Sequence, residues 1–135
     1  MRTVERTRFV DATPAELDRL LSPSAILEHE GTFSTVESTA GDEGTRVTAR
    51  GGGVEAMFAF QTLDDGFEYR QVGQRGPFEF METTLTYAAE NHGSEVRVRS
   101  TVSLGLPLPA LSDRLAAWKR RGELDRLLDG LAAEV

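Results

Sequence analysis

The sequence predicts an α+β fold in which a curved, seven-stranded antiparallel sheet wraps around one long C-terminal helix, with two short helices after the first strand. Three observations support this prediction. Between residues 31 and 104, strand-like runs are separated by short breaks rich in Gly, Asp and Asn, the residues that tight hairpin turns require. One strand and two short helices precede this region, and a long helical pattern follows it. Because a sheet with one apolar face must be covered, the terminal helix is expected to pack on it.

The first three elements are a strand over residues 3–11 and two short helices. The strand alternates imperfectly, because two of its arginines share a parity with its valines. Thr13 can cap the first helix, and Pro14 suits its first position. The second helix is expected over residues 23–30 and ends before Gly31.

Six consecutive strands are then expected, over residues 32–40, 45–53, 54–63, 67–74, 78–89 and 96–104. The short links between them favour a meander of antiparallel neighbours. The last strand alternates most cleanly, with Val96, Val98 and Val102 on one face and Arg97 and Arg99 on the other. That pattern is typical of a sheet with one dry face and one wet face.

The terminal helix, expected from Ala110 to Ala133, carries two apolar stripes. One stripe holds Leu111, Leu115 and Trp118, and the other consists of four leucines at positions 124, 127, 128 and 131. At 100° per residue the stripes point roughly 160° apart on a straight helix. We therefore expect a kink near Gly122, a weak helix former. The alternative is a straight helix whose first stripe faces a second subunit, which leaves monomer and homodimer open.

Composition excludes several classes of function. The 135-residue chain has no cysteine, so disulfides and thiolate metal sites are absent, and no metal or cofactor fingerprint is present. A net charge of −7 disfavours nucleic-acid binding, because the chain and the phosphate backbone repel. No apolar run is long enough for a membrane span, and no signal peptide opens the chain. The default expectation is a soluble, cytoplasmic protein.

Four stretches, at residues 10–23, 41–50, 93–104 and 120–135, resemble their counterparts in the polyketide cyclase/dehydrase-like group of the START-like (SRPBCC) superfamily. This resemblance implies the helix-grip fold, a single START-like domain over residues 1–135, and an apolar ligand held between sheet and helix. Many relatives have an aromatic pair where this chain has Glu28, His29 and Glu30. The mouth of the pocket is therefore expected to be more polar than usual.

Candidate ligand-binding residues are aromatic, polar or apolar side chains that could line or border this cavity: Phe58, Phe60, Tyr69, Gln71, Phe78, Phe80, Tyr87, Val98, Trp118 and His29. The aromatic residues would be ordinary core in a protein without a cavity. Among the ten candidates, Tyr69, Gln71 and Tyr87 are the polar anchors, because a buried hydroxyl or amide needs a partner that a ligand can provide. Cavities of this kind are mostly apolar with a few polar groups.

Two charged stretches have simpler interpretations. His29 could act as a general base, but the two carboxylates beside it cannot both face the ring on a helix, so a solvated helix end is favoured. Residues 118–121, Trp-Lys-Arg-Arg, are interpreted as a solvated helix face because the rest of the chain is acidic.

Three functions remain open. The first is binding or transport of a small hydrophobic molecule, without catalysis and without a catalytic residue. The alternative is a polyketide cyclase/dehydratase-like enzyme in which His29, Tyr69 or a carboxylate moves a proton within the same cavity. The third is an interaction protein, which predicts a filled core and an exposed apolar patch.

Overall fold

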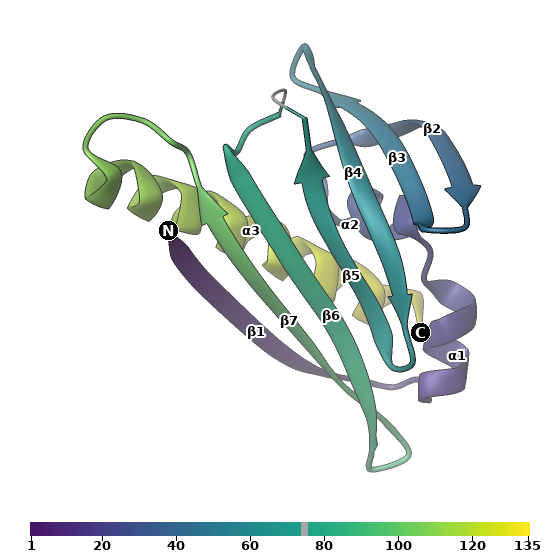
Figure 1. Cartoon of the computed structure of the whole chain (residues 1–135). Coiled ribbons are helices and arrows are strands. Elements are labelled where there is room, and N and C mark those ends of the chain that lie inside the picture. The colour runs from purple at the N-terminus through teal and green to yellow at the C-terminus, as the bar shows by residue number, and fades with distance from the viewer. Residues whose placement is uncertain (74–75) are drawn as a thin grey trace.

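The computed structural model describes residues 1–73 and 76–135. Its elements, in chain order and as labelled in Figure 1, are β1 (Arg2–Val10), α1 (Pro14–Leu20), α2 (Pro23–Glu30), β2 (Ser34–Gly41), β3 (Gly44–Gly51), β4 (Val54–Leu63), β5 (Gly66–Val72), β6 (Phe80–Glu90), β7 (Gly93–Ser103) and α3 (Pro109–Glu134). The predicted number and order of elements are confirmed. The strand expected over residues 67–74 ends at Val72, and its last expected residue, Gln74, lies outside the described residues.

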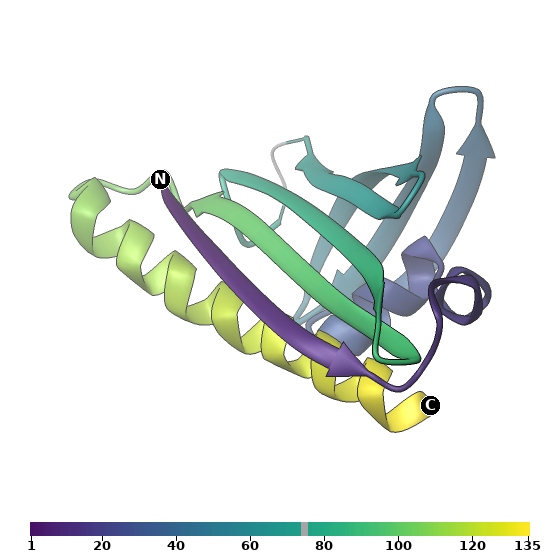
Figure 2. The ribbon, with the colours of Figure 1, turned by 90° about the horizontal axis from the view of Figure 1, so that it is seen from below.

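All seven strands form one antiparallel sheet in the order β1-β7-β6-β5-β4-β3-β2. The six later strands are a simple meander, as predicted, and β1 adds to the last of them. α2 and α3 lie on one face of the sheet, which we call the inner face (Figures 1 and 2). This arrangement is the helix-grip fold.

The inner and outer faces follow the alternation of the strands. In β4, for example, Ala56, Phe58 and Phe60 are buried, whereas Met57 and Gln61 are exposed. A strand places successive side chains on opposite faces, so the buried set faces α2 and α3. The core therefore lies between the inner face and these two helices.

The first strand alternates imperfectly because α3 lies along it. Arg6 and Arg8 share the inward parity of the buried Val4 and Val10. Arg6 pairs with Asp125 at 2.9 Å, and Arg8 pairs with Asp129 of the same helix. The two arginines thus extend past the core to carboxylates on α3, and their charge is compatible with the inward face.

The predicted kink in the terminal helix is wrong. α3 is one α-helix of 26 residues that runs through Gly122. Its buried face is continuous, because small and charged residues take the place of leucines in the first half: Ser112, Asp113, Ala116, Ala117, Arg120, Glu123, Leu124, Leu127, Leu128 and Leu131 are all buried. The first apolar stripe, with Leu111, Leu115 and Trp118, is exposed. Within the described residues, no helix is apolar enough over a sufficient length to cross a membrane.

Candidate functional site

An aromatic wall lines the inner face of β4 and β5. Phe58, Phe60 and Tyr69 are buried there, and Phe78, just before β6, is buried as well. The rings of Phe60 and Tyr69 stack with centroids 4.5 Å apart, because β4 and β5 place the two residues directly opposite each other. Phe33 packs edge-on against Phe58, with ring centroids 5.8 Å apart. Three of the predicted ligand-binding residues, Phe58, Phe60 and Tyr69, are thus brought together on adjacent strands.

A row of hydroxyl groups continues this wall across the next two strands. The register places Tyr69 of β5 opposite Thr83 of β6, and Thr83 opposite Ser100 of β7. All three residues are buried, and the Thr83 and Ser100 oxygens are 2.7 Å apart. Hydroxyl groups in this position must find hydrogen-bond partners, because burial without them is costly.

Arg120 supplies those partners from α3. Its Nε donates to Ser100 Oγ at 2.9 Å, and its Nη2 donates to Thr83 Oγ1 at 2.8 Å and to the Tyr69 hydroxyl at 3.3 Å. The same guanidinium binds both carboxylate oxygens of Glu30, at 2.7 and 3.1 Å. Arg120 is only 1% exposed, so a complete ion pair lies inside the protein.

A second carboxylate, Glu123, completes the group. It accepts a hydrogen bond from Arg120 Nη1 at 3.2 Å, from the Thr32 hydroxyl at 2.5 Å and from Lys119 Nζ at 3.3 Å. Two cations, Arg120 and Lys119, thereby balance the carboxylates of Glu30 and Glu123. We call Glu30, Tyr69, Thr83, Ser100, Arg120 and Glu123 the buried polar cluster. Together with Lys119 and Thr32, the protein thus supplies a partner to each charged group of the cluster.

The pKa shifts in the cluster all favour the ordinary charge states. Burial, followed by the charge of Glu30, raises the pKa of Tyr69 well above its usual value of 10. Burial alone would lower the pKa of Arg120, but Glu30, Tyr69 and Glu123 raise it overall. Burial would likewise raise the pKa of Glu123, yet Arg120, Thr32 and Lys119 together lower it. At neutral pH, Tyr69 is therefore neutral, whereas Arg120 and Glu123 are charged.

Two hydrogen bonds link Gln71 of β5 to Phe78, which lies just before β6. The Gln71 amide donates to the Phe78 carbonyl at 2.5 Å, and the Phe78 N–H donates to the Gln71 side-chain oxygen at 3.4 Å. Gln71 is half-buried and Phe78 is buried. These bonds tie the backbone of Phe78 to the last part of β5.

Tyr87 and Val98 lie further along the inner face. Val98 is fully buried on β7, and Tyr87 is buried on β6, near α1. The Tyr87 hydroxyl donates to Asp18 of α1. Burial and this hydrogen bond raise the pKa of Tyr87. Its predicted anchoring hydroxyl therefore already has a protein partner.

Two predicted residues lie outside the interior, and their expected placement is wrong. Trp118 projects into solvent, because the straight helix turns the opposite stripe inward. Phe80 is half-buried and shares the outward parity of Glu82, since Met81 beside it takes the inward position. A third predicted residue, His29, packs against Gly130 of α3 and lies 3.5 Å from Glu134. Its side chain is 20% exposed, at the edge of the contact between α2 and α3.

Sequence reasoning missed five members of the cluster: Glu30, Thr83, Ser100, Arg120 and Glu123. Arg120 and Glu123 have the helical spacing of the buried leucines at 124 and 127, so extending that stripe backwards would have placed both inside. Thr83 lies on the inward parity of β6. Glu30 was expected in a solvated helix end, yet it is buried. The sequence pattern that could have indicated a buried polar cluster is the presence of charged residues at positions that face the core.

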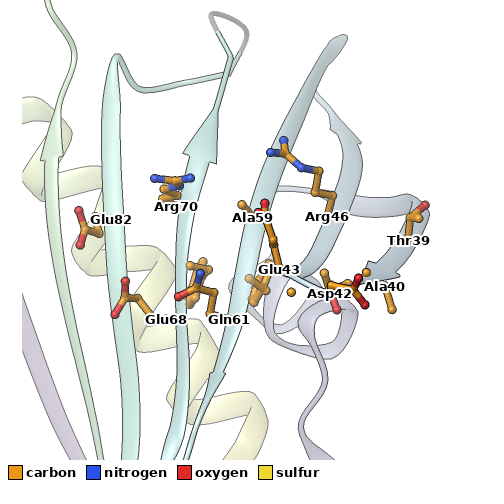
Figure 3. Close-up of a pocket in the computed structure, with 15 residues that line it drawn as sticks. Thr39, Ala40, Asp42, Glu43, Arg46, Ala59, Gln61, Glu68, Arg70 and Glu82 are labelled. Atoms are coloured by element: carbon orange, nitrogen blue, oxygen red, sulfur yellow. The ribbon is translucent and has the colours of Figure 1, made fainter.

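Two depressions lined by described residues lie on the outer face of the sheet. One, of about 810 Å³, is bounded by the β2–β3 hairpin and by outward side chains of β4, β5 and β6, among them Arg46, Gln61, Glu68, Arg70 and Glu82 (Figure 3). The other, of about 570 Å³, includes Met57 and Val72. Both lie on the side of the sheet that faces away from α3. The larger one is lined mainly by polar and charged groups. Among the described residues, no group of three His, Asp or Glu side chains could hold a metal.

Solved structures share this architecture. TTHA0849 from Thermus thermophilus matches with a TM-score of 0.76 and 20% identity, over 98% of this chain and 95% of that chain. A START superfamily protein from Mycobacterium smegmatis matches with a TM-score of 0.72 and 15% identity, over 98% and 97% of the two chains. The di-domain ARO/CYC BexL of the BE-7585A biosynthetic pathway matches with a TM-score of 0.64 and 23% identity, over 94% of this chain and 45% of that chain. At these identities the likeness shows the fold.

The family is shown by sequence over the full length. No curated protein matches the chain. The model of one family, described as polyketide cyclase/dehydrase and lipid transport, matches residues 1–135. The helix-grip fold and the START-type neighbours agree with that match. The chain therefore belongs to the polyketide cyclase/dehydrase and lipid transport family.

Proposed function

We propose that this chain, as a single START-like domain over residues 1–135, binds or carries a small, uncharged hydrophobic ligand between the inner face of the sheet and α3. The observation that carries the proposal is the aromatic wall of Phe58, Phe60 and Phe78 next to the buried polar cluster. Apolar sites with a few fixed polar groups are typical of small-molecule binding. The rings would hold the body of the ligand, and Tyr69 or Thr83 would bond a hydroxyl or carbonyl group.

The charge balance of the cluster argues for an uncharged ligand. Glu30 already binds Arg120 through both carboxylate oxygens. An anionic ligand would have to displace Glu30, and the displaced carboxylate would remain buried without its partner. Burying an unpaired charge costs several kcal/mol, roughly 3–5 in measured cases. A neutral ligand avoids this cost.

Entry of a ligand requires side chains of the interior to move apart, because the wall residues are in contact and buried. Phe78 is the side chain that we expect to move. It lies before the first residue of β6, and its backbone is held by the side chain of Gln71. Few hydrogen bonds would break if this residue swung outward.

Two fluorescent probes that differ by one sulfonate test the proposal. N-phenyl-1-naphthylamine is uncharged, and 8-anilinonaphthalene-1-sulfonate is its anionic counterpart. We expect the uncharged probe to bind more tightly. Phe58→Leu should weaken that binding about fivefold to tenfold, because apolar contact area is lost from the wall. Met57→Leu, the outward neighbour on the same strand, is the matched control. Tighter binding of the sulfonate, or equal binding to both variants, would contradict the proposal.

A second candidate function is a cyclase/dehydratase-like enzyme acting on a hydrophobic substrate at the same place. One observation favours it: the Tyr69 hydroxyl donates to Glu30, which pairs a proton donor with an acceptor in the interior. The pKa directions oppose it, since general acids and bases work best with pKa values near the operating pH, and the pKa of Tyr69 is raised. Turnover that Tyr69→Phe abolishes, with probe binding retained, would favour the enzyme.

A further inference from the structure

Five large apolar side chains are exposed on the N-terminal half of α3 and on the link that leads into it. Their exposed fractions are 54% for Leu106, 72% for Leu108, 58% for Leu111, 55% for Leu115 and 69% for Trp118. We call this set the leucine–tryptophan surface. Single exposed apolar residues are common, but a contiguous group of this size marks an interaction site.

The geometry of the helix brings three of these residues onto one side. Leu111, Leu115 and Trp118 are spaced i, i+4, i+7, and they point roughly 150° away from the buried Ala116 and Arg120 at 100° per residue. Figure 2 shows α3 below the sheet, and in the described part of the chain no other element lies beneath it. The leucine–tryptophan surface therefore faces outward.

The start of the helix adds an independent observation. Leu108 occupies the N-cap, where Ser, Thr, Asp or Asn is preferred, and it makes no side-chain capping bond. Its backbone is left-handed, with φ 60° and ψ 66°, a conformation that is unfavourable for leucine. Strained residues of this kind cluster at functional sites. Here the strained residue belongs to the exposed apolar surface.

The charges around the surface are positive, although the chain carries −7 in total. Arg114 is exposed and Arg121 is half-buried, whereas the charge of the half-buried Lys119 is paired with Glu123. Asp113, the one carboxylate of residues 104–122, is buried and bound to the N-terminal amine. Glu79 lies beside Gly105, at the edge of the surface. A negative partner therefore complements this half of the helix.

We propose that the leucine–tryptophan surface docks on an anionic lipid bilayer, with α3 lying in the headgroup region and not crossing it. Leucine and tryptophan on one side of a helix, flanked by Lys and Arg, are the features of an interfacial helix. Each Lys or Arg near an anionic membrane contributes favourably. A second copy of the chain is a poorer occupant, because a two-fold interface places the same cations on both sides. The inference goes beyond ligand binding and does not depend on it.

Trp118 is the only tryptophan of the chain, so its fluorescence reports on the surface directly. The experiment titrates the protein with vesicles of phosphatidylglycerol and phosphatidylcholine, and with vesicles of phosphatidylcholine alone. We expect a blue shift and protection from acrylamide quenching with the anionic vesicles, both reduced by salt. Arg114→Gln and Arg121→Gln should each weaken binding about fivefold.

Leu115→Glu should abolish the shift while the reporter remains in place. Val36→Glu is the matched control, because Val36 is also 55% exposed but lies on β2; it should bind as the unmodified chain does. Circular dichroism checks that each variant is folded. If Leu115→Glu does not fold, Leu115→Gln is used in its place.

The proposal is overturned by the absence of a shift, by equal binding to neutral vesicles, or by a lipid-free shift that grows with protein concentration and accompanies a dimer in sedimentation. If the surface instead binds an acidic protein, the vesicles should cause no shift of the Trp118 fluorescence. If the chain binds N-phenyl-1-naphthylamine but not vesicles, only this inference is overturned. If it binds vesicles but not N-phenyl-1-naphthylamine, only the proposed function is overturned.

Discussion

Arg120 joins α3 to α2 and to three strands through one side chain. Its guanidinium contacts Glu30 on α2, and Tyr69, Thr83 and Ser100 on β5, β6 and β7. Buried ion pairs contribute little net stability, because desolvation offsets the attraction, but removing one partner is costly. Arg120 therefore determines how α3 sits on the sheet more than how stable the protein is.

Arg120→Leu should lower the free energy of unfolding by about 3–5 kcal/mol, because Glu30 and Glu123 would remain buried without their cation. Replacing Glu30, Arg120 and Glu123 together by leucine should recover most of that loss, since none of these buried charges then remains. Urea denaturation followed by circular dichroism measures both effects. Arg121→Leu, the half-buried neighbour, is the control and should change the free energy of unfolding by less than about 1 kcal/mol. Additive losses in the triple variant would show that the charges are not coupled.

Glu123 should make stability fall in acid. Its pKa in the folded protein lies below the ordinary value of 4.5, so the unfolded chain binds the proton more readily. The stabilisation is fully present above pH 4.5 and is lost as the pH falls through the folded-state pKa. Glu123→Gln should therefore flatten the dependence of unfolding free energy on pH between about pH 5 and pH 3. Glu28→Gln, an exposed change on α2, should keep the original slope, and parallel curves for both variants would exclude this role of Glu123.

At the scale of single elements, α3 is the one that differs most from its prediction. Its straightness follows from an inward face that is small and charged in the first half and leucine-rich in the second. Gly122 lies within this helix without a bend, and a Cβ placed there would be 3.5 Å from Arg126, an ordinary contact. At Gly130 the same Cβ would lie 2.5 Å from the His29 ring.

These two glycines form a matched pair. Gly122→Ala should raise the free energy of unfolding by about 0.5–1 kcal/mol, because alanine is the better helix former and has room. Gly130→Ala should show a smaller gain or a loss, because His29 must move to admit the new methyl group. Thermal and urea unfolding of the two variants provide the comparison. An equal increase in the free energy of unfolding at both positions would mean that the His29 side chain can move aside without destabilising the protein.

Strand and helix boundaries could be predicted from the sequence because turns and caps are local. Thr13 and Glu16, for instance, cap α1 reciprocally, and Thr13 was identified by its type and position alone. The aromatic wall was also predictable, since Phe58 and Phe60 alternate with other residues in the pattern of a strand. The buried polar cluster was not, because its ion pair joins residues 90 positions apart. A charge at an inward position is tolerated only when a distant partner meets it, and the sequence does not show which partner does.

On the scale of the whole molecule, the two edges of the sheet are unequal. The edge strand β1 is covered by α3, whereas nearly all of β2 is exposed. The pairing of β2 with β3 is also irregular, with a register shift between Thr35 and Glu37, and the Thr35 hydroxyl is buried without a partner. Few buried side chains hold this edge in place.

Amide hydrogen exchange should therefore differ across the sheet. Amides of β2 and the adjoining half of β3 should exchange fastest, through local opening, whereas those of β6 and β7 should exchange only with global unfolding. Exchange measured by mass spectrometry on peptides of each strand tests this. Equal protection of β2 and β7 would show that the sheet opens only as one unit.

The pairing of β1 with β7 has a consequence for synthesis of the chain. Residues 2–10 find their partners only at residues 94–102, so the first strand made waits about 5–20 s at ordinary rates of translation. During this wait its unpaired backbone could join strands of other nascent chains. Arg6 and Arg8 interrupt its apolar side, and charges on an unpaired strand discourage such association. The same arginines that later reach α3 would thus protect the nascent chain on the ribosome.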